Sequence, residues 1–139
     1  MARIKIELPE QFPFTTKIPI RITDLNYGGH VGNDTILSLV HEARIQFLKS
    51  LGYGELDLEG VSLIMTDVGI EFKAELFYGD LVTAYVAASE ISRVGFDVCY
   101  KLMRDDMVIA IAKTGMICFN YKTKKVVSLP DKAKEKLSI

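Results

Sequence analysis

The chain has 139 residues, of which 49% are hydrophobic and 25% charged, and its formal net charge is −1. This length and composition predict an ordinary globular protein in which residues 1–139 form one domain. Because Lys and Arg are neither in excess nor clustered, we expect no nucleic-acid partner. No apolar run approaches the ~20 residues of a membrane-spanning helix, and the N-terminus lacks the apolar core of a signal peptide. We therefore expect a soluble, cytoplasmic protein with no membrane partner.

The cysteine and histidine content gives no sign of a disulfide framework or a metal site. Cys99 and Cys118 both lie in apolar stretches, where buried thiols in a reducing cytosol are expected. His30 and His41 are not spaced as a helical ligand pair, and the sequence has no Cys/His cluster. We expect neither a metal nor another cofactor.

The first segments predict extended structure. Residues 1–14, with Pro9 and Pro13, are expected to form an extended lead-in. The alternating and β-branched residues 15–23 predict a strand, and Pro19 places its start or a sheet edge at that point.

One long helix is predicted next, with Asn33 as its N-cap and Gly52 as its C′ residue. Its apolar residues follow helical spacing: Ile36, Val40, Ala43, Phe47 and Leu51. Further apolar residues lie on its other sides: Leu37, Leu39, Ile45 and Leu48. A helix that is apolar over most of its circumference is predicted to be buried over most of it.

The rest of the chain predicts a sheet. After a surface connection over residues 53–60, four strand-like segments separated by turns are residues 61–76, 81–89, 96–104 and 107–121. Gly115 predicts a bulge or bend in the last of them. A turn with a short extension (123–130) and a short terminal helix (131–137) follow. Long consecutive strands form a coiled antiparallel sheet, so we predict an α+β fold in which a curved sheet wraps a central helix.

The best candidate for a functional site is the loop before the long helix. Gly28, Gly29 and Gly32 allow backbone conformations and close approaches that a Cβ would forbid. Polar side chains lie between and beside these glycines: Asp24, Asn26, His30, Asn33 and Asp34. A polar, glycine-rich loop that leads into a helix N-terminus is typical of a binding or catalytic site.

This stretch resembles the signature of the hotdog-fold acyl-CoA thioesterases, in the 4-hydroxybenzoyl-CoA thioesterase-like branch that includes the YbgC-like enzymes. The matching residues are Asp24-Leu25-Asn26-Tyr27-Gly28-Gly29-His30-Val31-Gly32-Asn33 and, on the helix, Glu42-Ala43-Arg44. The turn 77–80 and residues 123–130 also match, so the resemblance covers about residues 15–130. It implies a hotdog fold and a thioester hydrolase acting on acyl-CoA. It also implies a homodimer or a homotetramer built as a dimer of dimers.

Two positions of the loop depart from the family pattern. Aligned on Gly29, His30 and Val31, the catalytic aspartate of the family falls on Asn26, and Asp24 matches its less essential first aspartate. Gly32 stands where the family has the first asparagine of an Asn-Asn pair. An amide cannot serve as a general base as a carboxylate does.

Thioester hydrolysis needs a donor for the developing oxyanion and a base or nucleophile. The resemblance implies that the backbone N–H at Asn33 polarises the carbonyl, although Asn33 as a plain N-cap is compatible with this. Asn26 could orient water, while Asp24, His30 or Glu42 could act as the base. The structural alternatives are an Asx contact for Asp24, a loop role for His30, and an ion pair of Glu42 with Arg44 or a subunit neighbour. His41 is expected to be structural.

Substrate contacts are expected at Tyr27, Gly29, Met65 and Arg93. Tyr27, Met65 and Phe72 are candidate pocket liners, each of which could equally belong to the core. Arg93, Lys113 and Lys122 are the cations available for the CoA phosphates. Because Asn26 occupies the carboxylate position, the alternative function is a non-catalytic hotdog protein that binds acyl-CoA or another acyl thioester.

Overall fold

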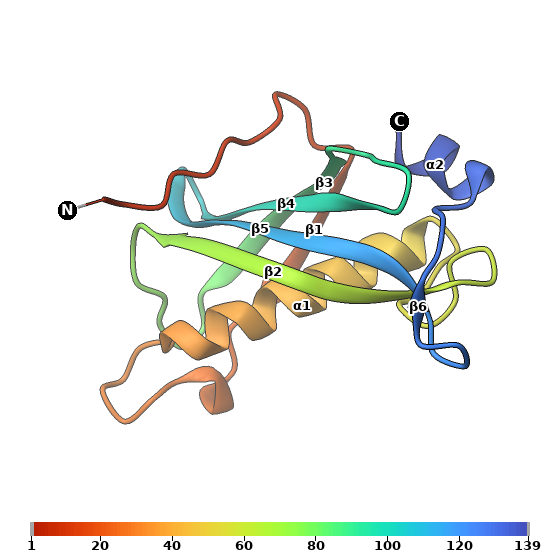
Figure 1. Cartoon of the computed structure of the whole chain (residues 1–139). Coiled ribbons are helices and arrows are strands. Elements are labelled where there is room, and N and C mark those ends of the chain that lie inside the picture. Colours follow the sequence, from red (N-terminus) through yellow and green to blue (C-terminus); the bar gives the residue numbers. More distant parts are fainter. Residues whose placement is uncertain (1, 139) are drawn as a thin grey trace.

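The structure, a computed structural model, describes residues 2–138 and contains an antiparallel sheet with a long helix across one face (Figure 1). The strands are β1 (Phe14–Pro19), β2 (Ser62–Phe72), β3 (Leu81–Ser89), β4 (Gly95–Arg104), β5 (Met107–Asn120) and β6 (Lys125–Val126). The helical elements are the 3-10 turn η1 (Ile22–Asp24), α1 (Asn33–Ser50) and α2 (Asp131–Leu137). The strand order is β1-β3-β4-β5-β2, with β6 paired to β5. This arrangement confirms the predicted α+β class.

The core lies between α1 and the concave face of the sheet. On β4, alternate residues Phe96, Val98, Tyr100 and Leu102 are buried and face the helix, as the period of a strand requires. On α1, the predicted apolar positions Ile36, Val40, Ala43 and Phe47 are buried against them. The buried face of the strand, with a period of two residues, and that of the helix, with a period of 3.6, therefore pack together in one core.

The C-terminal end of α1 is the one predicted. Gly52 has φ +86°, its N–H donates to the carbonyl of Lys49, and the N–H of Tyr53 donates to the carbonyl of Leu48. These two hydrogen bonds form a Schellman motif, in which glycine adopts the left-handed conformation without a Cβ penalty.

The strands differ from the sequence prediction in two ends and in the place of one irregularity. The strand predicted over residues 61–76 is β2, which ends at Phe72. The strand predicted over residues 15–23 ends at Pro19, because the Asp24 carboxylate accepts the backbone N–H of Arg21 at 2.8 Å and closes η1. The irregularity predicted at Gly115 lies instead in its partner strand, where the register shifts between Met65 and Asp67. A Cβ on Gly115 would meet Asp67 Oδ1 at 2.3 Å, so the glycine makes room for the bulge on β2.

The sheet does not bury α1 over most of its circumference. Ile45 remains 38% exposed, and Met65, Val68 and Phe72 on the helix-facing side of β2 are 43%, 41% and 50% exposed. β2 ends the strand order, so its outer edge and the adjoining flank of α1 are open in the single chain. The all-round apolar character of α1 therefore exceeds what its own sheet can cover.

Both cysteines are free and buried, as expected. Burial raises the pKa of the Cys118 thiol to about 11 and also raises that of Cys99. Among residues 2–138, no helix combines the length and the apolar character needed to cross a membrane.

Candidate active site

The glycine-rich loop is fixed at both ends to one segment of the chain. Ile20 exchanges backbone hydrogen bonds with the turn before β3, donating to Asp80 at 2.8 Å and accepting from Gly79 at 3.2 Å. At the other end, the N–H of Val31 donates to the carbonyl of Leu76 at 2.9 Å. Segment 76–80 thus holds the base of the loop, and the residues between are free to carry polar side chains.

Gly32, rather than Asn33, is the N-cap of α1. Its backbone is extended, with φ −75° and ψ 162°, and its carbonyl accepts the first helix hydrogen bonds from Thr35 and Ile36. Asn33 is already helical, so its N–H and that of Asp34 precede the first intrahelical bond and point out of the helix end. The prediction of Asn33 as N-cap was therefore wrong by one residue, and Asn33 is the first residue of the helix.

Three polar side chains are arranged around Gly28 and Gly32. A Cβ on Gly28 would lie 3.1 Å from Asn26 Oδ1 and 3.5 Å from His30 Nε2. A Cβ on Gly32 would lie 2.7 Å from Asp34 Oδ1 and 3.5 Å from Asn26 Nδ2. Asn26 therefore stands between His30 and Asp34, and each glycine provides space that a side chain would fill. The sequence placed Asp34 among the polar residues of the loop but gave it no catalytic role.

Two of these side chains are oriented by the loop backbone. Asn26 Oδ1 accepts the N–H of Gly28 at 2.8 Å, which directs the Nδ2 amide toward Gly32. His30 Nδ1 lies 3.2 Å from the carbonyl oxygen of Val31. Since a carbonyl can only accept, Nδ1 carries a proton, so Nε2 can accept a hydrogen bond when the ring holds no second proton.

His30 and Asn33 line a hollow of about 280 Å³ between the start of α1 and the end of β2. Phe72 and the segment that follows β2, including Glu75, form its other wall. Phe72 was a candidate liner from the sequence, and the structure brings it to the same hollow as His30 and Asn33.

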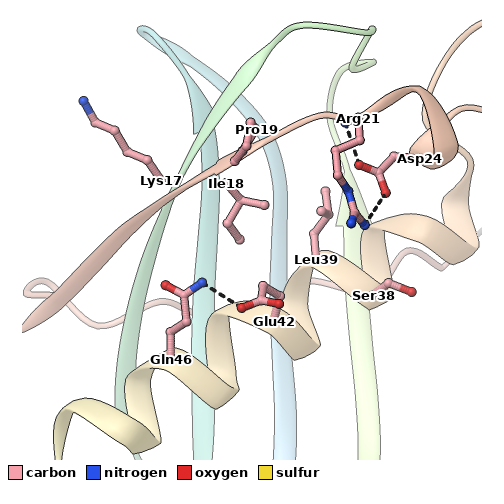
Figure 2. Close-up of a pocket in the computed structure, with 9 residues that line it drawn as sticks. All are labelled: Lys17, Ile18, Pro19, Arg21, Asp24, Ser38, Leu39, Glu42 and Gln46. Atoms are coloured by element: carbon pink, nitrogen blue, oxygen red, sulfur yellow. Dashed lines mark hydrogen bonds and ion pairs between the residues drawn. The ribbon is translucent and has the colours of Figure 1, made fainter.

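Asp24 and Glu42 lie elsewhere, in a groove of about 420 Å³ between β1 and α1 (Figure 2). The buried Asp24 carboxylate accepts the guanidinium of Arg21 at 3.3 Å as well as its backbone N–H. Glu42 is exposed and accepts the amide of Gln46 at 2.7 Å. Because β1 and β2 are at opposite ends of the strand order, this groove and the hollow lie on different flanks of α1. Asp24 and Asn26 thus do not share a face, since η1 replaces the expected extended segment.

Arg44 pairs with Glu55, not with Glu42. Its Nε donates to Glu55 at 3.0 Å and its Nη1 to the buried Tyr100 hydroxyl at 3.3 Å. Residues two apart point to different sides of a helix, which explains why Glu42 and Arg44 do not meet. His41 Nε2 lies 3.3 Å from the same Glu55 carboxylate, an arrangement in keeping with a structural role.

The remaining expected substrate contacts are dispersed over the single chain. Tyr27 is fully exposed at the loop tip beside Gly29, which has φ +83°. Met65 lies along β2, away from the loop. Arg93 is in the connection between β3 and β4, at the far end of the sheet from the loop (Figure 1).

The other two expected cations do not reach the loop either. Lys113 binds Asp67 at 2.9 Å on the face of the sheet opposite α1, and this hydrogen bond lowers the pKa of the Asp67 carboxyl. Lys122 is in the turn between β5 and β6, where Asn120 accepts its backbone N–H. Within residues 2–138, no group of three or more His, Cys, Asp or Glu residues is arranged to hold a metal ion.

A curved antiparallel sheet around one long helix, with a glycine-rich polar loop at the helix N-terminus, defines the hotdog class of fold. Residues 20–137 match the thioesterase-like superfamily, and the chain belongs to this superfamily of thioester hydrolases. It is 29% identical over 118 residues to a 1,4-dihydroxy-2-naphthoyl-CoA hydrolase of Microcystis aeruginosa, covering 83% of this chain and 86% of that protein.

Solved structures share the fold. The chain superimposes with a TM-score of 0.82 on a hypothetical protein from Aquifex aeolicus, at 26% identity, covering 90% of this chain and 99% of the other. A 1,4-dihydroxy-2-naphthoyl-CoA thioesterase from Synechocystis gives the same TM-score of 0.82 at 21% identity, covering 90% of this chain and 95% of that one.

Proposed function

We propose that this protein is a cytoplasmic acyl-CoA thioesterase that hydrolyses the thioester bond to a free acid and CoA, with Asn26 in the place of the usual aspartate. The observation that carries the proposal is the meeting of His30 and Asn33 in one hollow at the start of α1. The superfamily supports the reaction class, and the relative from Microcystis aeruginosa supports an aromatic acyl-CoA among the substrates.

The geometry supports a division of roles. The Asn33 N–H, at the positive end of the helix, donates to the thioester carbonyl oxygen and stabilises the negative charge that develops there. Asn26 Nδ2 donates to the attacking water, and His30 Nε2 accepts a hydrogen bond that holds the water in place. The water oxygen bonds to the carbonyl carbon, the bond between that carbon and sulfur breaks, and the proton that the water gives up passes to sulfur, so that CoA leaves as the thiol.

The test is release of CoA thiol from a panel of aromatic and linear acyl-CoA esters by the purified protein. We expect turnover in the wild type and a loss of about 10²- to 10⁴-fold in kcat for a residue that holds or moves the proton. His30→Ala and Asn26→Ala test the loop. Asp24→Asn and Glu42→Gln test the other candidate bases, which Arg21 and Gln46 hold in the second groove; for these we expect little change in kcat. No thiol release from any ester would contradict the proposal.

The alternative is a hotdog protein that binds an acyl thioester without turnover. The occupied Oδ1 of Asn26, which accepts the Gly28 N–H at 2.8 Å, favours this alternative. Calorimetric binding of an acyl-CoA without thiol release would support it. Under that alternative, Asn26→Asp should create activity, because it restores a carboxylate at the family position.

We further propose that two copies of the chain complete the site. The hollow is about 280 Å³, at the small end for a ligand pocket, and it opens beside the edge strand β2. Met65, Val68 and Phe72 leave an apolar strip exposed there. Light scattering of the wild type should give the mass of a dimer or tetramer, and Val68→Asp should lower it. A wild-type monomer would contradict this part of the proposal.

A further inference from the structure

The loop has an amide at Asn26 where the family has a carboxylate, but the carboxylate of Asp34 lies beside the same glycine, Gly32. Asp34 Oδ1 approaches to 2.7 Å of the point where a Cβ on Gly32 would lie, and Asn26 Nδ2 is 3.5 Å from the same point. The carboxylate of Asp34 and the amide of Asn26 are therefore separated by no more than the sum of these distances. An asparagine at position 32, as in the family pattern, would fill this space. Positions 26 and 32, the two that depart from the family pattern, therefore both lie close to the Asp34 carboxylate.

We propose that Asp34 is the general base of the thioesterase reaction, an inference that rests on the proposed function. Asp24 and Glu42 are engaged by Arg21 and Gln46 in the other groove. Asp34, in contrast, belongs to the first turn of α1, next to the Asn33 N–H to which the proposed function assigns the thioester carbonyl oxygen. A carboxylate in the first turn of a helix interacts favourably with the positive end of the helix dipole.

The proposed step balances as follows in atoms and electrons. A water oxygen attacks the carbonyl carbon of the thioester, and its proton passes to Asp34 Oδ1. The carbonyl oxygen becomes an oxyanion that the Asn33 N–H binds. When the oxyanion collapses, the carbon–sulfur bond breaks and its electron pair leaves with sulfur. The sulfur takes the proton from Asp34, which regenerates the carboxylate and releases the acid and the thiol.

Asp34→Asn tests the proposal, because it keeps the shape of the side chain and removes its basicity. We expect kcat to fall about 100-fold or more with KM changed little. The matched control is Asp131→Asn, which removes an acidic side chain from the first turn of α2 and should leave kcat unchanged. Thermal melts of both variants measure how much the Tm falls when a carboxylate is lost from the first turn of a helix.

The pH profile distinguishes a base from a structural carboxylate. For the wild type, kcat should fall toward acid pH, because a protonated carboxyl group can no longer act as a base, and this fall forms the acid limb of the profile. Asp34→Asn should abolish this acid limb, and formate should partly restore turnover to Asp34→Ala.

Three results would overturn the assignment: wild-type turnover in Asp34→Asn, a loss equal to that in Asp131→Asn, or an acid limb that persists in Asp34→Asn. A loss of activity confined to Glu75→Gln would also overturn it, since Glu75 lines the hollow. If the wild type hydrolyses no thioester, the proposed function fails and this inference fails with it. If the wild type is active and Asp34→Asn is unaffected, the inference alone fails.

Discussion

Substitutions at Gly32 are expected to change the activity of the loop much more than the stability of the helix. Gly32 has φ −75° and ψ 162°, which any residue adopts without strain. In Gly32→Ala, however, the new Cβ would lie 2.7 Å from Asp34 Oδ1, whereas ordinary contact begins at 3.4 Å. The carboxylate must therefore move by about 0.7 Å or more, the difference between these two distances. The substitution displaces one polar side chain and leaves the backbone in place.

The expected effects of Gly32→Ala on stability and on activity differ in magnitude. Loss of a good N-cap lowers the unfolding free energy by about 1 kcal/mol. Alanine also restricts the unfolded chain more than glycine does, and this smaller entropy of the unfolded state offsets about 0.4 to 1 kcal/mol of that loss. The net change in unfolding free energy should stay within about 1 kcal/mol, or about 4 °C in Tm. A misplacement of about 1 Å in a catalytic group can cost up to about 100-fold, so we expect kcat/KM to fall about 10- to 100-fold, or about 1.4 to 2.7 kcal/mol.

The assay compares thiol release and thermal melting across a small series. Gly32→Ser restores a good N-cap but keeps the Cβ, so it should recover Tm and not activity. Gly54→Ala is the matched control, because a Cβ on Gly54 would have no neighbour within 4 Å. Wild-type kcat/KM in both Gly32 variants would refute the reasoning. So would activity that rises and falls with Tm across the series.

Other predictions concern stability and reactivity. Arg44→Ala should lower the unfolding free energy by about 3 kcal/mol, measured by urea denaturation, because it leaves Glu55 without its buried partner. Burial and the hydrogen bond to Glu59 raise the pKa of Tyr53 from 10.0 to about 12, so its contribution to stability is full below pH 10. Wild type should lose that contribution as the pH rises from 10 to 12, and Tyr53→Phe should show a smaller loss in melts over that range. Because the Cys118 thiol is buried with a pKa of about 11, it should react with a thiol reagent at pH 8 only after unfolding.

The parts of the fold that depend on local chemistry could be read from the sequence. The alternation in β4 and the spacing of Ile36, Val40 and Phe47 define which faces are buried. Gly52 ends α1 because the left-handed conformation favours glycine at that position. Each of these features is set by a few neighbouring residues.

The features that depend on distant partners could not be read in the same way. Asparagine is a favoured N-cap, but the Val31 N–H bound to Leu76 fixes the chain so that residue 32 is still extended and the helix begins at Asn33. Arg44 meets Tyr100, which is 56 residues further along the chain. Asp34 becomes a candidate base only when the space above Gly32 is seen in three dimensions.

Because the glycine-rich loop is attached to segment 76–80 at both ends, its residues can evolve with little effect on the rest of the fold. Both ends of the loop meet one short segment, through Ile20 at Asp80 and Val31 at Leu76. The side chains inside the loop, such as Asn26 and the fully exposed Tyr27, add little to the core. Replacing them therefore costs the scaffold little, and a carboxylate lost at one position can be regained at another. The same closed loop can thus acquire a new reaction or substrate while the sheet and helix stay as they are.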